Sequence, residues 1–89
     1  MYYTVTANTD LTTKPKKLKS WHFSNTHATN VGVVNLRNGS VSGDIVAKIL
    51  LPVVNGFQSQ AYSSPEGLVF PIGLYVEVAA GTVVGSVDL

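Results

Sequence analysis

Apolar and polar residues alternate along most of the chain, a pattern that predicts β-strands and not helices. Val, Thr, Gly, Asn and Ser are common, and Gly or Pro recurs roughly every ten residues. The clearest alternation lies at 44–52, "DIVAKILLP". There, every second residue from Ile45 to Leu51 is expected to face the core, and Pro52 ends the strand.

Seven or eight short strands are expected, because turn residues separate this number of alternating segments. The segments are 2–7, 18–25, 31–37, 44–52, 57–63, 68–70, 74–79 and 82–89. Asn38-Gly39 predicts a tight turn, and Ala80-Gly81 predicts a hairpin between the last two strands. The 89 residues therefore predict one all-β domain over 1–89, a single antiparallel β-sandwich with jelly-roll connections.

The predicted core is made of apolar residues at inward positions of these strands. They are Trp21, Phe23, Ile45, Ile49, Leu51, Leu74, Val76 and Val78.

Composition indicates that the protein associates with other chains. Of its residues, 45% are hydrophobic and only 12% charged, about half the usual charged share. Cysteine is absent, so disulfides and thiolate sites are excluded. Because so short a chain buries a modest core, association with further subunits is the expected additional stabilisation.

The positive charge is concentrated in one segment, "KPKKLKSWHFSN" at 14–25. Residues 1–19 hold four Lys and one Asp (+3), whereas residues 20–89 hold two basic and four acidic residues (−2). Lysines beside Trp21 and Phe23 could bind nucleic acid through the loop at 14–19. A lysine-bearing loop at about 8–17 that enters a core strand is the favoured interpretation, because the other strands supply only Arg37 and Lys48. The loop could also meet an acidic protein surface.

No catalytic or metal site is predicted. His22 and His27 are the two histidines, no serine lies in a nucleophile motif, and the acidic residues show no pairing or ligand spacing. We therefore expect neither enzymatic activity nor a cofactor.

Candidate interface residues combine contact area with hydrogen-bonding groups and charge. An ordinary polar edge strand is the alternative for those at 57–63. The candidates are Tyr2, Tyr3, Lys14, Lys16, Lys17, Phe57, Gln58, Gln60 and Tyr62.

The stretches "KLKSWHFSNTHATNVGVVNLRNGSVSGDIVAKILLP" and "GLVFPIGLYVEVAAGTVVGSVDL" resemble small virion structural proteins of tailed bacteriophages. The resemblance covers most of residues 17–89, and the lysine cluster and the Tyr2-Tyr3 start have no counterpart in the family's pattern. The positions that match its strand-and-turn motifs are Leu36, Asn38, Gly39, Gly43, Ile45, Pro52, Phe70, Gly73, Leu74, Val76 and Val78.

This resemblance implies a capsid cement or decoration protein at the virion surface. Its expected partners are the major capsid protein and copies of itself, as a homotrimer. The alternative is a carbohydrate- or receptor-binding module of a phage fibre or tail that uses Trp21, Tyr62 and the Asn/Gln-rich loops. No signal-peptide pattern or membrane-spanning run is seen, so synthesis in the host cytoplasm and no membrane contact are expected.

The division of 14–25 into a loop and a core strand gives a prediction about stability. Trp21→Ala should lower the free energy of unfolding by about 3–5 kcal/mol, because it removes a large buried ring. Replacing Lys14, Lys16 and Lys17 with glutamine should leave that free energy nearly unchanged. Urea denaturation measures both, and equal losses would contradict the division.

Overall fold

The computed structural model describes residues 1–14, 17–53, 56–62 and 67–89. Within these ranges the chain forms strands and no helix, so the all-β prediction is confirmed. The strands are β1 (Tyr2–Val5), β2 (Thr9–Leu11), β3 (Lys17–Leu18), β4 (Ser20–Asn25), β5 (Gly32–Asn38), β6 (Asp44–Leu51), β7 (Gly56–Ala61), β8 (Leu68–Val69), β9 (Leu74–Ala80) and β10 (Val83–Asp88).

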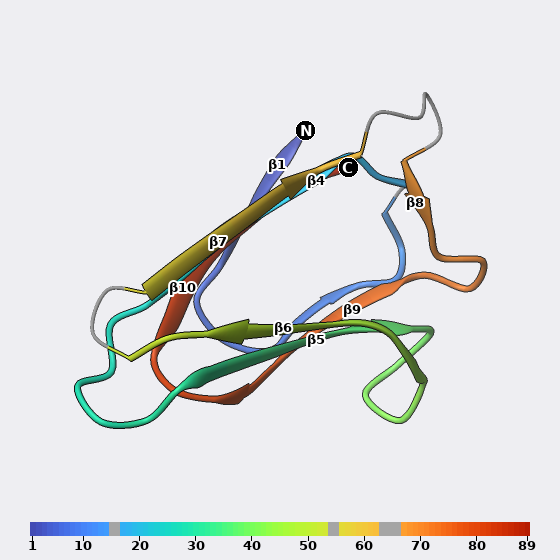
Figure 1. Cartoon of the computed structure of the whole chain (residues 1–89). Helices are drawn as coiled ribbons and strands as arrows, with labels where there is room; N and C mark the ends of the chain where they lie inside the picture. Colours follow the sequence, from blue (N-terminus) through green and yellow to red (C-terminus); the bar gives the residue numbers. More distant parts are fainter. Residues whose placement is uncertain (15–16, 54–55, 63–66) are drawn as a thin grey trace.

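Two four-stranded antiparallel sheets face each other. Their strand orders are β1-β10-β4-β7 and β2-β9-β5-β6, and β3 and β8 form a third, two-stranded sheet. In Figure 1 the two large sheets converge on one side and diverge on the other, where β8 lies across the open end. The short sheet therefore closes the wedge between the large ones.

The pairing follows one rule along the whole chain. β1 pairs with β10, β2 with β9, β3 with β8, β4 with β7 and β5 with β6, all antiparallel. The chain is thus one long antiparallel ribbon that turns at β5–β6. The ribbon is rolled up so that β10 also pairs with β4 and β9 with β5. A rolled ribbon of this kind, divided into two sheets, is the jelly-roll arrangement that the sequence predicts.

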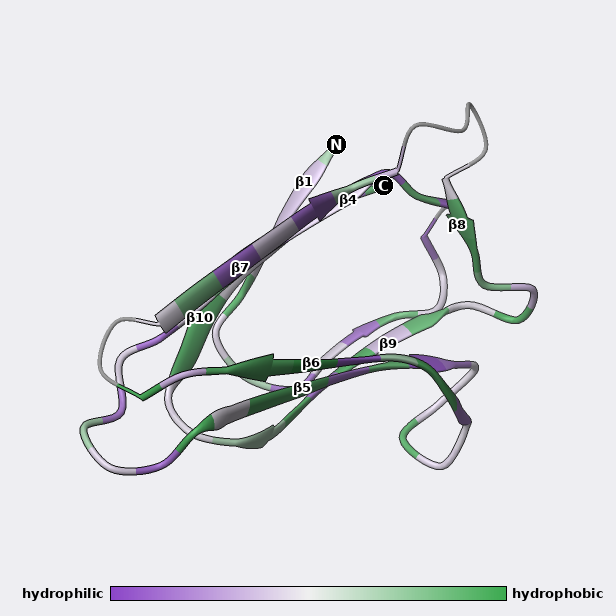
Figure 2. Cartoon of the chain, in the orientation of Figure 1, coloured by the Kyte–Doolittle hydropathy of each residue, from purple (hydrophilic) through white to green (hydrophobic). Residues whose placement is uncertain are grey.

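The space between the sheets is filled by apolar side chains. Hydrophobic residues dominate β6, whereas β7 carries hydrophilic ones (Figure 2). Of the predicted core residues, six are buried and Val78 is partly buried against them. The six are Trp21, Phe23, Ile49, Leu51, Leu74 and Val76.

The prediction for Ile45 is wrong, because its side chain is 44% exposed. The pairing of β5 with β6 shifts between Leu36, which lies opposite Ala47, and Arg37, which lies opposite Ile45. Val46 is the extra residue of this β-bulge. A bulge breaks the two-residue alternation of inward and outward side chains. Leu51, Ile49 and Ala47 keep the inward parity, and Ile45, beyond the bulge, does not.

Two expectations about connections are also corrected. β9 and β10 do not form a hairpin, because β9 lies in one large sheet and β10 in the other. The expected loop at 8–17 contains strand β2, paired with β9, and Lys17 opens β3. These short strands, β2 and β3, raise the total within the described ranges to ten. Both strands belong to the antiparallel ribbon, in which β2 pairs with β9 and β3 pairs with β8.

A buried asparagine holds together the end of the sandwich where these crossings occur. Asn25, the last residue of β4, is fully buried. Its Nδ2 donates to the carbonyls of Asn30 (2.9 Å) and Pro52 (3.2 Å). Its Oδ1 accepts from the backbone N–H groups of His27 (3.0 Å) and Thr82 (3.1 Å). One side chain therefore links the connections that follow β4, β6 and β9.

Gly81 makes room for this asparagine at the crossing from β9 to β10. Its φ of 80° lies in the left-handed region that favours glycine. A Cβ atom there would lie 2.8 Å from Asn25 Oδ1 and 2.8 Å from the Cα of Gly32. Gly81, which predicted a hairpin, thus lies in the turn where the chain crosses from one large sheet to the other.

We predict that Asn25→Ala lowers the free energy of unfolding by about 3 kcal/mol, since several hydrogen bonds worth roughly 1 kcal/mol each are lost inside the protein. The matched control is Asn30→Ala, which alters an exposed side chain in the next connection and should change stability by less than about 0.5 kcal/mol. Urea denaturation compares the two, and similar losses would show that the buried amide has no special role.

Candidate assembly interface

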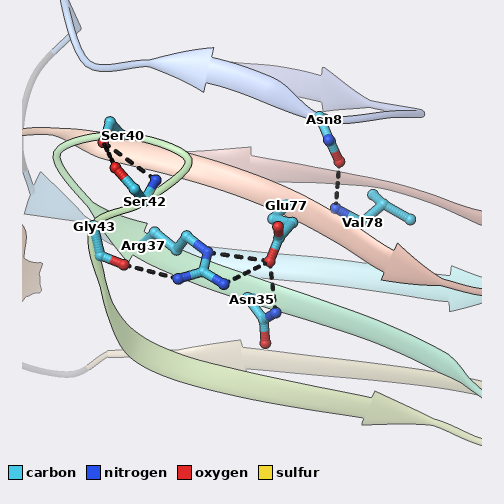
Figure 3. Close-up of polar contacts among 8 residues, drawn as sticks. All are labelled: Asn8, Asn35, Arg37, Ser40, Ser42, Gly43, Glu77 and Val78. Carbon is cyan, nitrogen blue, oxygen red and sulfur yellow. Dashed lines mark hydrogen bonds and ion pairs between the residues drawn. The ribbon is translucent and has the colours of Figure 1, made fainter.

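The outer face of the sheet β2-β9-β5-β6 carries an ionic cluster. Arg37 on β5 and Glu77 on β9 form an ion pair, with 3.0 Å between Nη2 and Oε1. Asn35 Nδ2 donates to the same Oε1 at 2.8 Å, and Arg37 Nη1 donates to the carbonyl of Gly43 at 2.8 Å. Figure 3 shows these contacts, together with Asn8 Oδ1 accepting from the N–H of Val78. The cluster therefore fastens β5 to β9 and to the connection before β6.

The hydrogen bond from Asn35, then that from Arg37, with the positive charge of Arg37 adding to them, lowers the pKa of the Glu77 carboxyl below its ordinary 4.5. Asn35 is 5% exposed, and its Oδ1 has no partner among the described residues. The other polar groups of the cluster bond to one another within their own sheet, so the cluster stabilises the pairing of β5 with β9.

The outer face of the other sheet has almost no charge. Among the residues of β1, β4, β7 and β10, Asp88 is the one Asp, Glu, Lys or Arg. Ser86, His22 and Ser59 lie side by side across three strands. We call this surface the hydroxyl face and define it by Tyr2, Ser20, His22, Phe57, Ser59 and Ser86.

Two exposed aromatic rings flank the serines of the hydroxyl face. Tyr2 is 71% exposed and Phe57 is 66% exposed. The Phe57 ring lies 6.0 Å from the imidazole of His22, centroid to centroid. A hollow of about 220 Å³ lies beside Tyr2, lined also by Ser20, Trp21, His22, Ser59, Gln60, Ala61 and Ser86. The face therefore combines apolar contact area with hydroxyl groups and an imidazole that can make hydrogen bonds.

The structure divides the predicted interface residues between several surfaces. Tyr2 and Phe57 belong to the hydroxyl face. Gln58 and Gln60 are exposed on the other side of β7, where Gln58 Nε2 donates to the carbonyl of Leu50. Lys17 is exposed on β3, and Lys16 lies outside the described residues.

The tyrosines Tyr3 and Tyr62 are partly buried, and each packs one side against the core. The hydroxyl of Tyr62 accepts a hydrogen bond from Trp21 Nε1 at 3.2 Å. The ammonium of Lys14 lies 5.7 Å from the centre of the Tyr3 ring, a cation–π contact within the chain. Because Trp21 is 8% exposed, its ring is not free to stack on a sugar or a base.

Sequence reasoning missed Ser20, His22, Ser59 and Ser86 as members of one face. The outward parity of Ser20 and His22 in "SWHFSN" was readable, because the alternate residues Trp21 and Phe23 point inward. Their proximity to Ser59 and Ser86 depends on the strand order β10-β4-β7. The sequence pattern does not give this strand order, so it could not group the four residues.

Within the described residues, no cluster of three or more His, Asp or Glu side chains has the geometry to hold a metal ion. His27 accepts at Nδ1 from the backbone N–H groups of Thr29 (3.1 Å) and Asn30 (3.0 Å), and so caps a turn. The described part of the chain contains no helix long and apolar enough to cross a membrane.

Comparisons with protein-family models, with curated proteins and with solved structures give no match for this chain.

The ionic cluster predicts a pH-dependent contribution to stability. Because folding lowers the pKa of Glu77, its carboxylate stabilises the fold above pH 4.5, and this contribution is lost as the pH falls through the lower, folded value. Glu77→Gln should therefore destabilise the protein at pH 7, and the difference from wild type should shrink at pH 3. Urea denaturation at both values measures it, with the exposed Asp44→Asn as control. A pH-independent difference would contradict the role of the ion pair.

Proposed function

We propose that the protein is a non-enzymatic virion structural protein of a tailed bacteriophage. In this role it decorates the capsid, binding the major capsid shell and copies of itself. The observation that supports the proposal best is the hydroxyl face, which is uncharged apart from Asp88 and bears exposed aromatic rings. The resemblance of residues 17–89 to small phage virion proteins supplies the identity of the partner.

The chemistry of the hydroxyl face suits a protein contact. Aromatic residues are enriched and Lys, Glu and Asp depleted at the centres of protein interfaces. Covering Tyr2 and Phe57 removes apolar surface from water. The serines can exchange hydrogen bonds with water for bonds with a partner, and no unpaired charge is buried at the centre of the face.

The hollow on this face favours a macromolecular partner over a small ligand. Its volume of about 220 Å³ is below the roughly 300–1,000 Å³ of typical ligand pockets. A glycan-binding role would have to use Tyr2 and the serines, because the ring of Trp21 is buried. We therefore place capsid decoration first and glycan binding second.

A decoration protein stabilises a shell because it binds the assembled form and not the free subunits. Each contact can be modest, since many copies act together on one particle. A compact sandwich with one face of low charge fits this role, where Asp88 is paired with the N-terminal ammonium at 2.7 Å. On the opposite sheet, Arg37 and Glu77 are paired with each other.

The test is the amount of protein bound to purified phage particles. Tyr2→Ser should reduce the number of copies per particle at least about tenfold, because it removes a large exposed ring of the kind that dominates interface energy. The matched control is Ile72→Ser. Ile72 lies between β8 and β9 and is 64% exposed, compared with 71% for Tyr2, and its replacement should leave the copy number unchanged.

Copies per particle are counted by quantitative mass spectrometry after density-gradient purification. Circular dichroism confirms that both variants fold. Wild-type protein that never sediments with particles would contradict the function. Equal binding by the two variants would contradict the assignment of the face. Saturable binding of the isolated protein to host-surface glycans, without particle binding, would favour the second role.

A further inference from the structure

The four outer edges of the two large sheets differ in how well they are protected from pairing with another chain. β1 has four residues and β2 has three, and such short edges offer little to pair with. β6 is longer, but it carries Lys48, the bulge at Val46 and Pro52 just after its end. β7 has six residues, "GFQSQA", without charge, proline or bulge. Within the described part of the chain it is the one long edge without these protective features.

The direction of the free backbone groups on β7 follows from its pairing with β4. The N–H of Tyr62 donates to the carbonyl of Lys19 at 2.9 Å, which continues the register of β4 and β7. Backbone groups in an antiparallel strand face alternate sides. The backbone groups of Gln58 and Gln60 therefore bond to β4, whereas the N–H and C=O groups of Phe57, Ser59 and Ala61 point away from the sheet. Of these, the carbonyl of Ala61 accepts one long bond from Gln60 Nε2, at 3.5 Å.

We propose that β7 pairs antiparallel with β7 of a second copy, about a two-fold axis at Ser59. In this register Ser59 lies opposite Ser59 of the partner, and Phe57 lies opposite Ala61. These are the three residues whose backbone groups face outward, so each finds hydrogen-bonded partners in the other copy. The two four-stranded sheets join into one continuous sheet.

The side chains of β7 are complementary to themselves in this arrangement. On the hydroxyl face the large Phe57 lies beside the small Ala61, so the exposed ring is covered without two bulky groups meeting. On the other side Gln58 lies opposite Gln60, where two amides can bond with each other. No like charges face each other, because β7 has none.

A two-fold contact closes on itself. Each copy uses its single β7 edge, so the product is a dimer and not a growing fibre. The inference deepens the proposed function, since it names the contact between copies, and it does not depend on which shell the protein binds. A trimer of the kind that the resemblance implies would need a different surface.

A single cysteine tests the register directly, because the natural chain has none. Hydrogen-bonded antiparallel pairs have Cα atoms about 5.5 Å apart, within the roughly 4.4–6.8 Å that a disulfide spans. Ser59→Cys should form a covalent dimer on mild oxidation of the full chain. The control Thr4→Cys, exposed on β1 at the opposite edge of the same sheet, should remain mostly uncrosslinked.

Charge at the axis gives a second test, read by sedimentation equilibrium. The wild-type chain should be dimeric, and Ser59→Lys or Ser59→Glu should each raise the dimer dissociation constant at least about tenfold, since like charges meet across the axis. Mixing the two variants should restore a dimer. Thr4→Lys should behave as wild type.

A wild-type monomer or trimer would overturn the inference. So would a dimer that Thr4→Lys weakens as much as Ser59→Lys does, or one that mixing fails to restore. A wild-type chain that stays monomeric and instead binds an added capsid-protein peptide along β7 would overturn it as well. These outcomes are separate from the particle-binding test at Tyr2, so dimerisation and capsid decoration can fail independently.

Discussion

Backbone pairing between the two arms of the chain is the constraint on which the rest of the structure depends. Each strand bonds to the strand that lies equally far from the other end, from β1 with β10 to β5 with β6. Once this ribbon is rolled, the strands of each sheet come from both arms. The side-chain sets described above, including the core, Asn25, the ionic cluster and the hydroxyl face, then join residues that are far apart in sequence.

The outer faces of the two large sheets differ in chemistry. The sheet that contains β5 and β9 carries Arg37 and Glu77, whose ion pair is internal to the sheet. The other sheet leaves aromatic and hydroxyl groups exposed. A short chain has few charged residues to distribute. Five of them lie on β2, β5, β6 and β9, whereas the other large sheet holds only Asp88. The outer face of that second sheet therefore has little charge to desolvate on binding.

The sequence pattern predicted the fold well where the two-residue alternation is regular. Trp21 and Phe23 on β4, and Leu74 and Val76 on β9, face the core as expected, because each strand keeps its parity. The prediction failed for Ile45, since the bulge at Val46 has no signature of its own in "DIVAKILLP". It failed again at Ala80-Gly81, because a glycine turn looks the same in sequence whether the chain forms a hairpin or crosses to another sheet.

The candidate site was only partly predictable for a related reason. Exposure of Tyr2 and Phe57 followed from their strand positions, but Tyr3 and Tyr62 pack against the core through contacts made by distant segments. The grouping of His22 with Ser59 and Ser86 depends on which strands are neighbours. Neighbour relations in a rolled ribbon are set by pairing across the whole chain, and local pattern does not determine them.

The pairing order of the ribbon also determines at which stage of folding the hydroxyl face forms. The β5–β6 pair is the most local and can close early, whereas the β1–β10 pair joins residues near the two ends, and pairings so distant in sequence form slowly. The hollow of the hydroxyl face takes Tyr2 from one end, Ser86 from the other and Ser59 from the middle. A chain that stops partway along its folding route lacks this surface. Under the proposed function, recognition through the hydroxyl face would select finished molecules, and misfolded copies would be left out of the assembly.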